Sequence, residues 1–428
     1  MASRISMQDV QTRNAALSRK RWSILAASCL ANLCVGSVYS WSVFAGPMAR
    51  HLNALNGTSL TAADLAIVFS LANGDAFITM ILGGILDRTL GARLMILIGV
   101  TVFGLGFIVS SMATNTLTLA LGYGILCGLA EGFTYVCTIS NTVKFFPDKK
   151  GLAGGISTAS YGLSSILIPP VADALTHAVG VNRAFLIFGA VIIGLAFVSS
   201  LSIVNCPDDF VPDGWTPQAG MGAAGAGDKS TLQMLSSSVF YVMLAMLFVG
   251  STLGLMAISE AASIAQTMIG MTSAAAALVV SVLALFNTAG RIAAGWISDR
   301  IGRVKTLMAV YILAAAASLT TYVSGGNKSV ALFCGGICLV GLCYGAFMGV
   351  YPGFTSDQFG VKHSSLNYGV MFVGFSSAGF AGPMTMRAVF NGQGSYRPAF
   401  LMAAGLAVSG LAISFLYRAI AKKDELSG

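Results

Sequence analysis

The chain has 428 residues, of which 56% are hydrophobic and only 9% are charged, and its mean hydropathy is +0.80. This composition excludes a water-soluble globular protein and indicates an integral membrane protein. The formal net charge of +8 does not indicate a nucleic-acid-binding protein, because most of the basic residues fall in short segments between apolar runs.

Twelve apolar segments follow one another along the chain, and each is long enough to cross a bilayer core of about 30 Å as a helix. A transmembrane β-barrel would instead show segments of about ten residues with alternating polarity. The sequence therefore predicts an all-α membrane protein with twelve transmembrane helices. The expected spans are 22–47, 64–86, 94–114, 116–144, 152–179, 183–205, 239–266, 273–298, 304–324, 329–356, 364–390 and 397–418.

The distribution of Lys and Arg predicts the orientation. Twelve spans place both termini on one face, and 18 of the 24 basic residues lie in the terminal segments or in the loops after even-numbered spans. Basic residues concentrate on the cytoplasmic side of a membrane. We therefore expect a multi-pass protein of the plasma membrane, the inner membrane of a bacterium, with both termini in the cytoplasm.

A weak internal repeat divides the chain into halves. The segment GGILDRTLGAR (83–93) follows the second span and AGWISDRIGR (294–303) follows the eighth. Between the halves, prolines, acidic residues and a Gly/Ala run interrupt the hydropathy and indicate a flexible linker. We predict an N-terminal six-helix bundle over 1–205, a cytoplasmic linker over 206–238 and a C-terminal six-helix bundle over 239–428.

The repeated loops carry candidate gating residues. Asp87 and Asp299 each lie where a span ends at the cytoplasmic surface, close to basic residues such as Arg300. An ion pair that forms in one conformation and breaks in another suits a protein whose halves move against each other. We therefore predict gating roles for Asp87, Asp299 and Arg300; the alternative is a solvated loop that only fixes the topology.

Arg291 lies inside an apolar span, eight residues from Asp299 and thus about 12 Å from the cytoplasmic edge. An arginine near the bilayer centre costs about 2.5–3.5 kcal/mol on insertion scales and has no neutral form. The equivalent position of the first half is Thr79, so the charge is not a duplicated feature of the architecture. We predict that Arg291 anchors an anionic substrate; the alternatives are a buried ion pair with Asp75 or Glu131, or a packing role with bonds to backbone carbonyls.

Two acidic residues also lie at mid-span depth. Asp75 is about 18 Å, and Glu131 about 20 Å, from the cytoplasmic edge. Burial favours the neutral form of a carboxyl group and a nearby arginine favours the charged form. Protonation of Glu131 or Asp75 is therefore a candidate for proton coupling or gating, and structural pairing or a hydrogen bond between helices remains the alternative.

Aromatic residues at similar depths complete the candidate site. Tyr135 lies one turn from Glu131, Tyr344 lies at a comparable depth in the tenth span, and Tyr39 lies in the first span. A phenol offers one hydrogen-bond donor in an otherwise apolar wall, which suits a small organic acid, although a single tyrosine more often serves packing. We add Asn287, one turn before Arg291, to the candidate substrate-binding residues, and we expect no cofactor or metal.

Several of these motifs resemble those of a known family. GWISDRIGR is similar to the Gly-x-x-x-Asp-Arg-x-Gly-Arg signature of the major facilitator superfamily, and the first copy has one extra residue before Gly91. Within that superfamily the chain resembles the oxalate/formate antiporters and, more distantly, the monocarboxylate transporters. The matching segments are YSWSVFAGP, KFFPDKKGLAGG, GRIAAGWISDRIGR, and SDQFG followed by NYG.

The resemblance implies a secondary transporter that works by alternating access. It implies that Arg291 binds the carboxylate, that Tyr39, Tyr135 and Tyr344 line the cavity, and that the Asp and Arg of the repeated loops latch helix ends together. Relatives that handle dicarboxylates carry a second intramembrane cation, a Lys, where this chain has Phe375. One buried cation favours one carboxylate, because an unpaired second carboxylate costs several kcal/mol in a medium of low dielectric constant.

We therefore expect a transporter of a small organic monocarboxylate such as lactate, pyruvate or formate, working as an anion exchanger or with protons. The alternatives are an oxalate/formate antiporter, a drug/proton antiporter, a sugar carrier or a non-transporting membrane sensor. An enzyme is disfavoured, because the three histidines lie near the membrane surfaces and form no ligand pattern. The expected partners are the substrate, protons and the lipid bilayer, without nucleic acid, and the expected state is a monomer.

Overall fold

The computed structural model describes residues 7–74, 76–216 and 227–427. Every regular element in these residues is a helix, and the all-α fold is confirmed. Lipid offers no partner for backbone N–H and C=O groups, so the apolar segments satisfy them within helices.

The N-terminal half contains α1 (Met7–Val35), η1 (Gly36–Ser40), α2 (Trp41–Asn56), α3 (Ala66–Gly74), α4 (Ala76–Leu90), α5 (Ala92–Ser111), α6 (Thr116–Leu119), η2 (Ala120–Leu126), α7 (Cys127–Phe145), α8 (Lys150–Val179) and α9 (Val181–Ser202). After α10 (Thr231–Leu235), the C-terminal half contains α11 (Ser238–Ser259), α12 (Ala261–Ile264), η3 (Ala265–Ile269), α13 (Ser273–Ile301), α14 (Arg303–Asn327), α15 (Val330–Phe359), α16 (Ser364–Met371), α17 (Val373–Gln393) and α18 (Arg397–Ser427).

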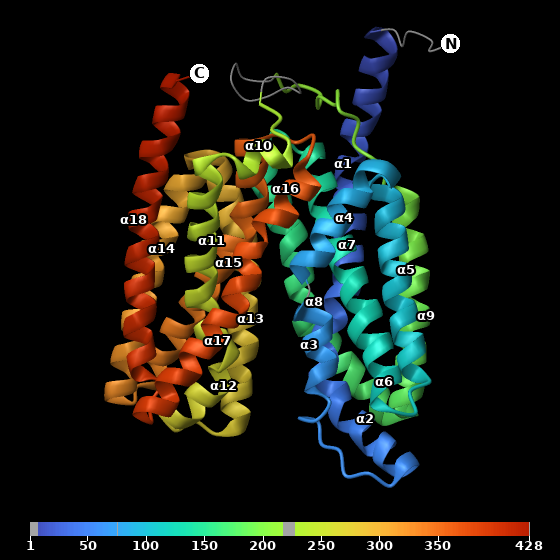
Figure 1. Ribbon diagram of the computed structural model, residues 1–428, viewed down its shortest axis with the longest axis vertical. Coiled ribbons are helices and arrows are strands. Elements are labelled where there is room, and N and C mark those ends of the chain that lie inside the picture. Colours follow the sequence, from blue (N-terminus) through green and yellow to red (C-terminus); the bar gives the residue numbers. More distant parts are fainter. Residues whose placement is uncertain (1–6, 75, 217–226, 428) are drawn as a thin grey trace.

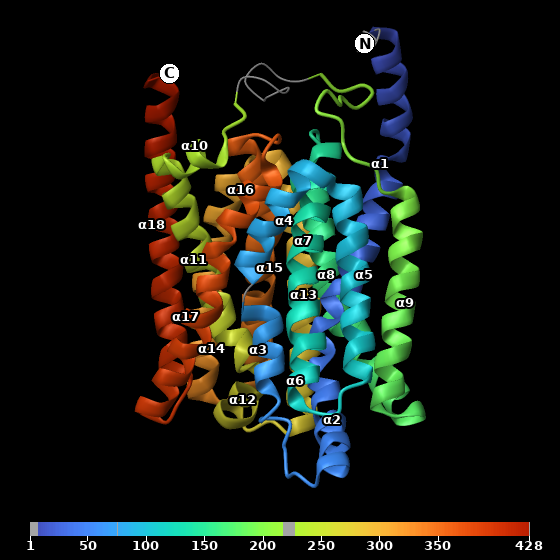
Figure 2. The same ribbon diagram turned by 45° about the vertical axis from the view of Figure 1, so that its right-hand side comes forward.

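The helices form two groups that stand side by side, with α1 to α9 in one group and α11 to α18 in the other (Figure 1). The first turns of α1 and the last turns of α18 project beyond the other helices at the same end of the molecule, in both orientations (Figure 2). We call this end the terminal face, and the other end the opposite face.

Eleven helices of the described residues are long and apolar enough to cross a membrane. The expected span 364–390 does not meet that criterion. It consists of two helices that meet at Phe372, and the longer of them, α17, carries Ser376, Ser377 and Arg387. These polar side chains lower the hydropathy of a segment that lines the central cavity.

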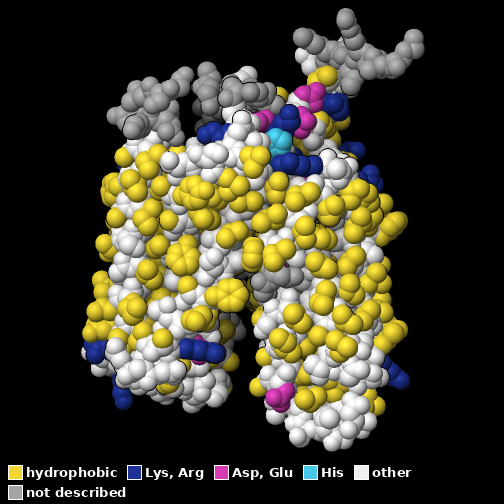
Figure 3. All heavy atoms as spheres, viewed as in Figure 1, with side chains coloured by type: hydrophobic (Ala, Val, Ile, Leu, Met, Phe, Trp, Pro, Cys, Tyr) yellow, Lys and Arg dark blue, Asp and Glu magenta, His cyan; other side chains and the backbone are white. Residues whose placement is uncertain are grey.

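The two groups are in contact on the side of the terminal face and separate toward the opposite face (Figure 1). Helix α8 of the N-terminal half packs against α13 and α15 of the C-terminal half. Helices α4 and α7 of the N-terminal half pack against α16. The space-filling view shows a hollow between the groups that opens at the opposite face (Figure 3). The structure is therefore closed at the terminal face and open at the opposite face.

Glycine makes the contact between α8 and α13 possible. A Cβ atom at Gly155 would overlap the backbone oxygen of Arg291, and a Cβ atom at Gly295 would overlap the backbone oxygen of Gly151. Small residues of this kind let two transmembrane helices approach at the distance of their backbones. The close approach brings the backbone of Arg291 directly against the N-terminal half.

The sequence predicts a flexible linker over 206–238, whereas the described ends of this segment are docked on the two halves. Near the first end, the carboxylate of Asp209 forms an ion pair with Arg13 at 2.5 Å. Near the second end, Asp228 accepts a hydrogen bond from the backbone N–H of Val361 at 2.8 Å. The part between these anchors, residues 217–226, lies outside the described residues.

Candidate functional site

A cavity of about 300 Å³ lies between the two halves. This volume is at the lower end of the range for small-molecule sites. Nine helical segments of both halves and the junction between α16 and α17 contribute to its wall. The lining residues are Tyr39, Phe69, Ser70, Asn73, Ala76, Met80, Glu131, Gly132, Tyr135, Tyr161, Leu255, Arg291, Tyr344, Met348, Phe372, Phe375, Ser376, Gly379 and Phe380.

Arg291 reaches this wall from α13. Its side chain is buried, and its Nη1 donates a hydrogen bond of 2.7 Å to the backbone oxygen of Thr158 on α8. Its Nε lies 3.2 Å from the side-chain oxygen of Asn287, one turn earlier on α13. Asn287 is not among the residues that line the cavity, so in this structure it orients the guanidinium rather than facing the cavity itself.

The contacts of Arg291 bear on the three roles predicted for it: anchoring a substrate, forming a buried ion pair, and packing against backbone carbonyls. The bond to the oxygen of Thr158 is of the kind expected for a packing role. The guanidinium nevertheless borders the cavity, and within the described part of the chain it forms no ion pair with a carboxylate. Asp75, the other candidate partner, lies outside the described residues.

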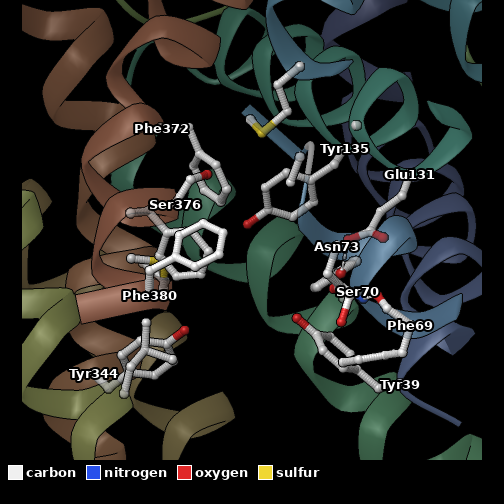
Figure 4. A pocket seen from close by; sticks show the side chains of 18 of the residues that line it. Tyr39, Phe69, Ser70, Asn73, Glu131, Tyr135, Tyr344, Phe372, Ser376 and Phe380 are labelled. Carbon is white, nitrogen blue, oxygen red and sulfur yellow. Dashed lines mark hydrogen bonds between the residues drawn. The ribbon is translucent and has the colours of Figure 1, made fainter. Parts of the chain in front are cut away.

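Three tyrosines place hydroxyl groups around the cavity. Figure 4 shows the hydroxyl groups of Tyr39, Tyr135 and Tyr344 pointing into the space between the two halves. Tyr135 and Tyr344 are each 6% exposed, whereas Tyr39 is 38% exposed and lies at the accessible side of the cavity. All three tyrosines predicted from the sequence therefore lie around one cavity together with Arg291.

Glu131 lines the same cavity, and one of its partners is a residue that the sequence analysis missed. The hydroxyl group of Tyr161 on α8 donates a hydrogen bond to Oε1 of Glu131. The ring of Tyr161 also lies against the rings of Tyr135 and Tyr39, with centroid distances of 5.0 and 5.6 Å. Tyr161 lies 11 residues into α8, about 17 Å along the helix, so the criterion of depth that selected Tyr135 would have selected it too.

The C-terminal half contributes an apolar, aromatic wall. Phe372 and Phe375 pack with their ring centroids 4.4 Å apart, and Phe375 lies 6.4 Å from the ring of Tyr344. Phe375 therefore faces the cavity at the position where the resemblance implies a lysine in transporters of dicarboxylates. Among the described lining residues, Arg291 is the one permanent cation.

The terminal face is closed by charged residues around Asp299. Its two carboxylate oxygens accept hydrogen bonds of 2.8 Å from the backbone N–H groups of Gly151 and Leu152, in the first turn of α8. Negative charge is stabilised at a helix N-terminus, where N–H groups lack partners within the helix. A residue of the C-terminal half thus caps a helix of the N-terminal half.

Basic residues extend this contact into a network. Arg303 forms ion pairs with Asp299 at 2.7 Å and with Asp357 at 2.8 Å. Lys150, at the start of α8, forms a third ion pair with Asp357 at 2.8 Å. The network joins α8 of one half to α13, α14 and α15 of the other.

The other two predicted gating residues differ in their contacts. Asp87 accepts a hydrogen bond from the hydroxyl group of Ser365, near the start of α16, so it also joins the two halves. Arg300 instead points away from the network, and its guanidinium lies 3.6 Å from the ring centroid of Trp296 on an exposed surface. The arginine that contacts Asp299 is Arg303, the first residue of α14.

Comparisons with known proteins identify the family. The sequence profile of the Major Facilitator Superfamily matches residues 28–383 and 230–427. The chain belongs to the Major Facilitator Superfamily. It is therefore a multi-pass membrane transporter of this superfamily, as the repeated Asp-Arg motif indicated.

The chain is similar to several individual transporters of the superfamily. The chain is 26% identical over 430 residues to the oxalate:formate antiporter of Oxalobacter formigenes, and the match covers 98% of each chain. It is 25% identical to human monocarboxylate transporter 11, over 92% of this chain and 82% of that protein. It is 29% identical to the MFS-type transporter YhjX of Escherichia coli, over 83% and 85% of the two chains.

Solved structures share the fold. A crystal structure of FucP in the outward conformation superposes with a TM-score of 0.64 at 17% identity and covers 91% of this chain and 98% of that chain. The proton:xylose symporter XylE superposes with a TM-score of 0.71 at 13% identity and covers 93% and 96% of the two chains. At these identities the likeness concerns the fold alone.

Proposed function

We propose that this transporter carries a small organic monocarboxylate of the lactate, pyruvate or formate type by alternating access. The observation that carries the proposal is one guanidinium, that of Arg291, in a cavity of about 300 Å³ walled by aromatic rings. The hydrogen bonds of Arg291 to described residues use two of its five N–H groups. The remaining groups suit the two oxygens of one carboxylate, and charge-assisted bonds of this kind are strong and directional.

The aromatic wall favours a monocarboxylate over a dicarboxylate. A second carboxylate would lie against Phe372, Phe375 or Tyr344, where no described lining residue provides a second cation. Leaving it unpaired in a cavity of low dielectric constant would cost several kcal/mol. The methyl group of lactate or pyruvate would instead pack against these rings at no such cost.

The similarity to the oxalate:formate antiporter over nearly the whole chain supports the substrate class and favours oxalate as the second candidate. The similarity to monocarboxylate transporter 11 supports the first candidate. Both relatives are named for carboxylates.

We further propose that the terminal face is cytoplasmic and that the membrane is the inner membrane of a bacterium. The excess of Lys and Arg at that face supports this orientation. The transporter then presents its cavity to the outside in the present conformation. Rocking of the two halves, with rupture of the contacts of Asp299 and Asp87, would open the cavity to the cytoplasm.

Glu131 and Tyr161 are the proposed coupling residues. Both are in the N-terminal half and line the same cavity as Arg291, so substrate and proton would act on one site. If the protein exchanges anions without protons, Glu131 has a structural role and its replacement leaves the pH dependence unchanged.

Counterflow in proteoliposomes tests the substrate class. Vesicles are loaded with unlabelled substrate, and uptake of labelled lactate, formate and oxalate is compared for the wild type, Arg291→Gln and Arg291→Lys. We expect saturable uptake of a monocarboxylate, its loss in Arg291→Gln and a large reduction in Arg291→Lys, which keeps the charge without the planar fork. Wild-type uptake in Arg291→Gln, or uptake restricted to oxalate, would refute the proposal.

A pH gradient across the same vesicles tests the coupling. We expect Glu131→Gln to abolish the pH dependence of net uptake while counterflow continues, because exchange needs no net proton movement. Tyr161→Phe added to Glu131→Gln should cause no further change, since residues that act as one unit are not additive. Independent, additive effects would show that the two residues do not form a coupling pair.

A further inference from the structure

A second cavity, of about 330 Å³, opens at the terminal face and is separate from the central cavity. Both halves and the first part of the linker contribute to it. The lining residues are Gly84, Asp87, Arg88, Gly91, Ala92, Asn141, Lys144, Asn205, Cys206, Asp208, Lys362, His363, Ser365 and Leu366. We call it the seam cavity, because it lies where α4 and α7 of one half meet the segment before α16 of the other.

Cations converge on the seam cavity from three places. Arg88 comes from α4, Lys144 from the last turn of α7, and Lys362 from the segment between α15 and α16. None of the three forms an ion pair with a carboxylate among the residues that the structure describes. The excess of basic residues at this face explains their sign, but it does not explain why they meet at one cavity across the seam.

Backbone N–H groups at helix starts also border the seam cavity. Gly91 and Ala92 lie at the start of α5, and Ser365 and Leu366 lie at the start of α16, so two helix N-termini border the cavity. The last turns of α4 and α7, which carry Arg88 and Lys144, also border it, so the helix dipoles largely offset one another. Helix N-termini are common binding sites for phosphate and other anions. Lys and Arg side chains gather at this face around the seam (Figure 3).

Two carboxylates also face the cavity and must be counted. Asp87 is engaged with the hydroxyl group of Ser365, and Asp208 comes from the linker. The three permanent cations outnumber the two carboxylates. The pKa of His363 is lowered from its ordinary value, chiefly by burial and then by the positive charges of Arg88 and Lys362, while the carboxylate of Asp228 acts in the opposite direction.

We propose that the seam cavity binds a phosphate group, either of a soluble phosphate or of an anionic lipid headgroup, and that the bound group holds the terminal face closed. Its ligands belong to both halves, with Arg88 and Lys144 on one side and Lys362 on the other. Opening of the terminal face separates these ligands, so the anion binds the closed state more tightly. Any ligand that prefers one state shifts the equilibrium toward it.

Direct binding tests the site without reference to the transported substrate. The full-length protein in phosphatidylcholine nanodiscs is titrated with inorganic pyrophosphate by calorimetry at constant ionic strength. We expect saturable binding that is weakened about five- to tenfold in Lys144→Gln and in Lys362→Gln, because each variant loses one positive charge that faces the phosphate. Lys149→Gln is the matched control, because Lys149 is exposed at the same face and does not line the cavity.

The source of the phosphate is decided by repeating the titration with phosphatidylglycerol in the nanodiscs. Competition by the lipid would identify the headgroup as an occupant, and unchanged binding would identify a soluble phosphate. The effect on conformation is measured by hydrogen exchange of the peptide that contains Gly151 and Leu152. Pyrophosphate should slow this exchange in the wild type but not in Lys362→Gln. Equal weakening of pyrophosphate binding by all three lysine variants would overturn the proposal. The proposal would also fail if pyrophosphate did not bind and phosphatidylglycerol did not change the hydrogen exchange of this peptide.

Discussion

The carboxylate of Asp299 accepts a hydrogen bond of 2.8 Å from the backbone N–H of Gly151, and these two residues belong to different halves of the transporter. The bond satisfies a helix N-terminus that would otherwise need water. It can exist only while the halves touch at the terminal face. The pair therefore contributes to the stability of the conformation in which the central cavity is open to the opposite face.

Replacing Asp299 with Asn should weaken the closed terminal face. The change removes the charge at the start of α8, and a capping carboxylate contributes about 1–2 kcal/mol, so the ratio of closed to open molecules should fall about 5- to 30-fold. Hydrogen exchange of the peptide that contains Gly151 and Leu152 measures this directly. Asp173→Asn is the control, because Asp173 lies at the far end of the same helix and is 60% exposed; unchanged exchange in Asp299→Asn would show that the cap does not hold the face closed.

Gly155→Ala should destabilise the contact between α8 and α13. The added methyl group would overlap the backbone oxygen of Arg291, and overpacking of this kind costs about 1–3 kcal/mol. The midpoint of thermal unfolding in detergent should fall accordingly. Gly194→Ala, where a Cβ atom meets nothing within 4 Å, should be neutral or stabilising; equal behaviour of the two variants would argue against backbone contact at this seam.

Asn287→Ala should weaken substrate binding even though Asn287 does not line the cavity. The change removes the acceptor 3.2 Å from Nε of Arg291, so the guanidinium loses one of the bonds that fix its direction. We expect the KM for the monocarboxylate to rise about tenfold, in line with the loss of one hydrogen bond to a charged group. Ser281→Ala, on the exposed side of the same helix, is the control and should leave the KM unchanged. An unchanged KM in Asn287→Ala would exclude the orienting role of Asn287.

Phe375→Lys should shift the preference toward a dicarboxylate. The new ammonium group would lie in the wall that faces Tyr344, where a second carboxylate can form a charge-assisted pair. The affinity for oxalate relative to formate, measured by competition in counterflow, should rise about tenfold or more. Phe375→Gln, which is polar but uncharged, separates the effect of charge from that of lost aromatic packing; a similar shift in both variants would contradict the electrostatic explanation.

The sequence alone determined the class of the protein and the depth of its polar residues. Length and hydropathy are local properties, and a helix rises by about 1.5 Å per residue, so the depths of Arg291, Glu131 and Tyr135 could be counted from the ends of their spans. The cavity brings all three together. The same count places Tyr161 at a similar depth, but its hydrogen bond to Glu131 joins two helices and could not be counted from the sequence.

Only the tertiary structure decided which side chains meet and which conformation is present. Arg300 follows Asp299 directly but points to Trp296, whereas Arg303 begins the next helix, α14, and the turn at Gly302 brings it back to pair with Asp299. The seam cavity depends on segments 270 residues apart in the chain, since Lys362 is brought beside Ala92 by the packing of α16 on α4. The closed terminal face is likewise a matter of packing between the halves, because two conformations of a transporter share one sequence and differ by only a few kcal/mol.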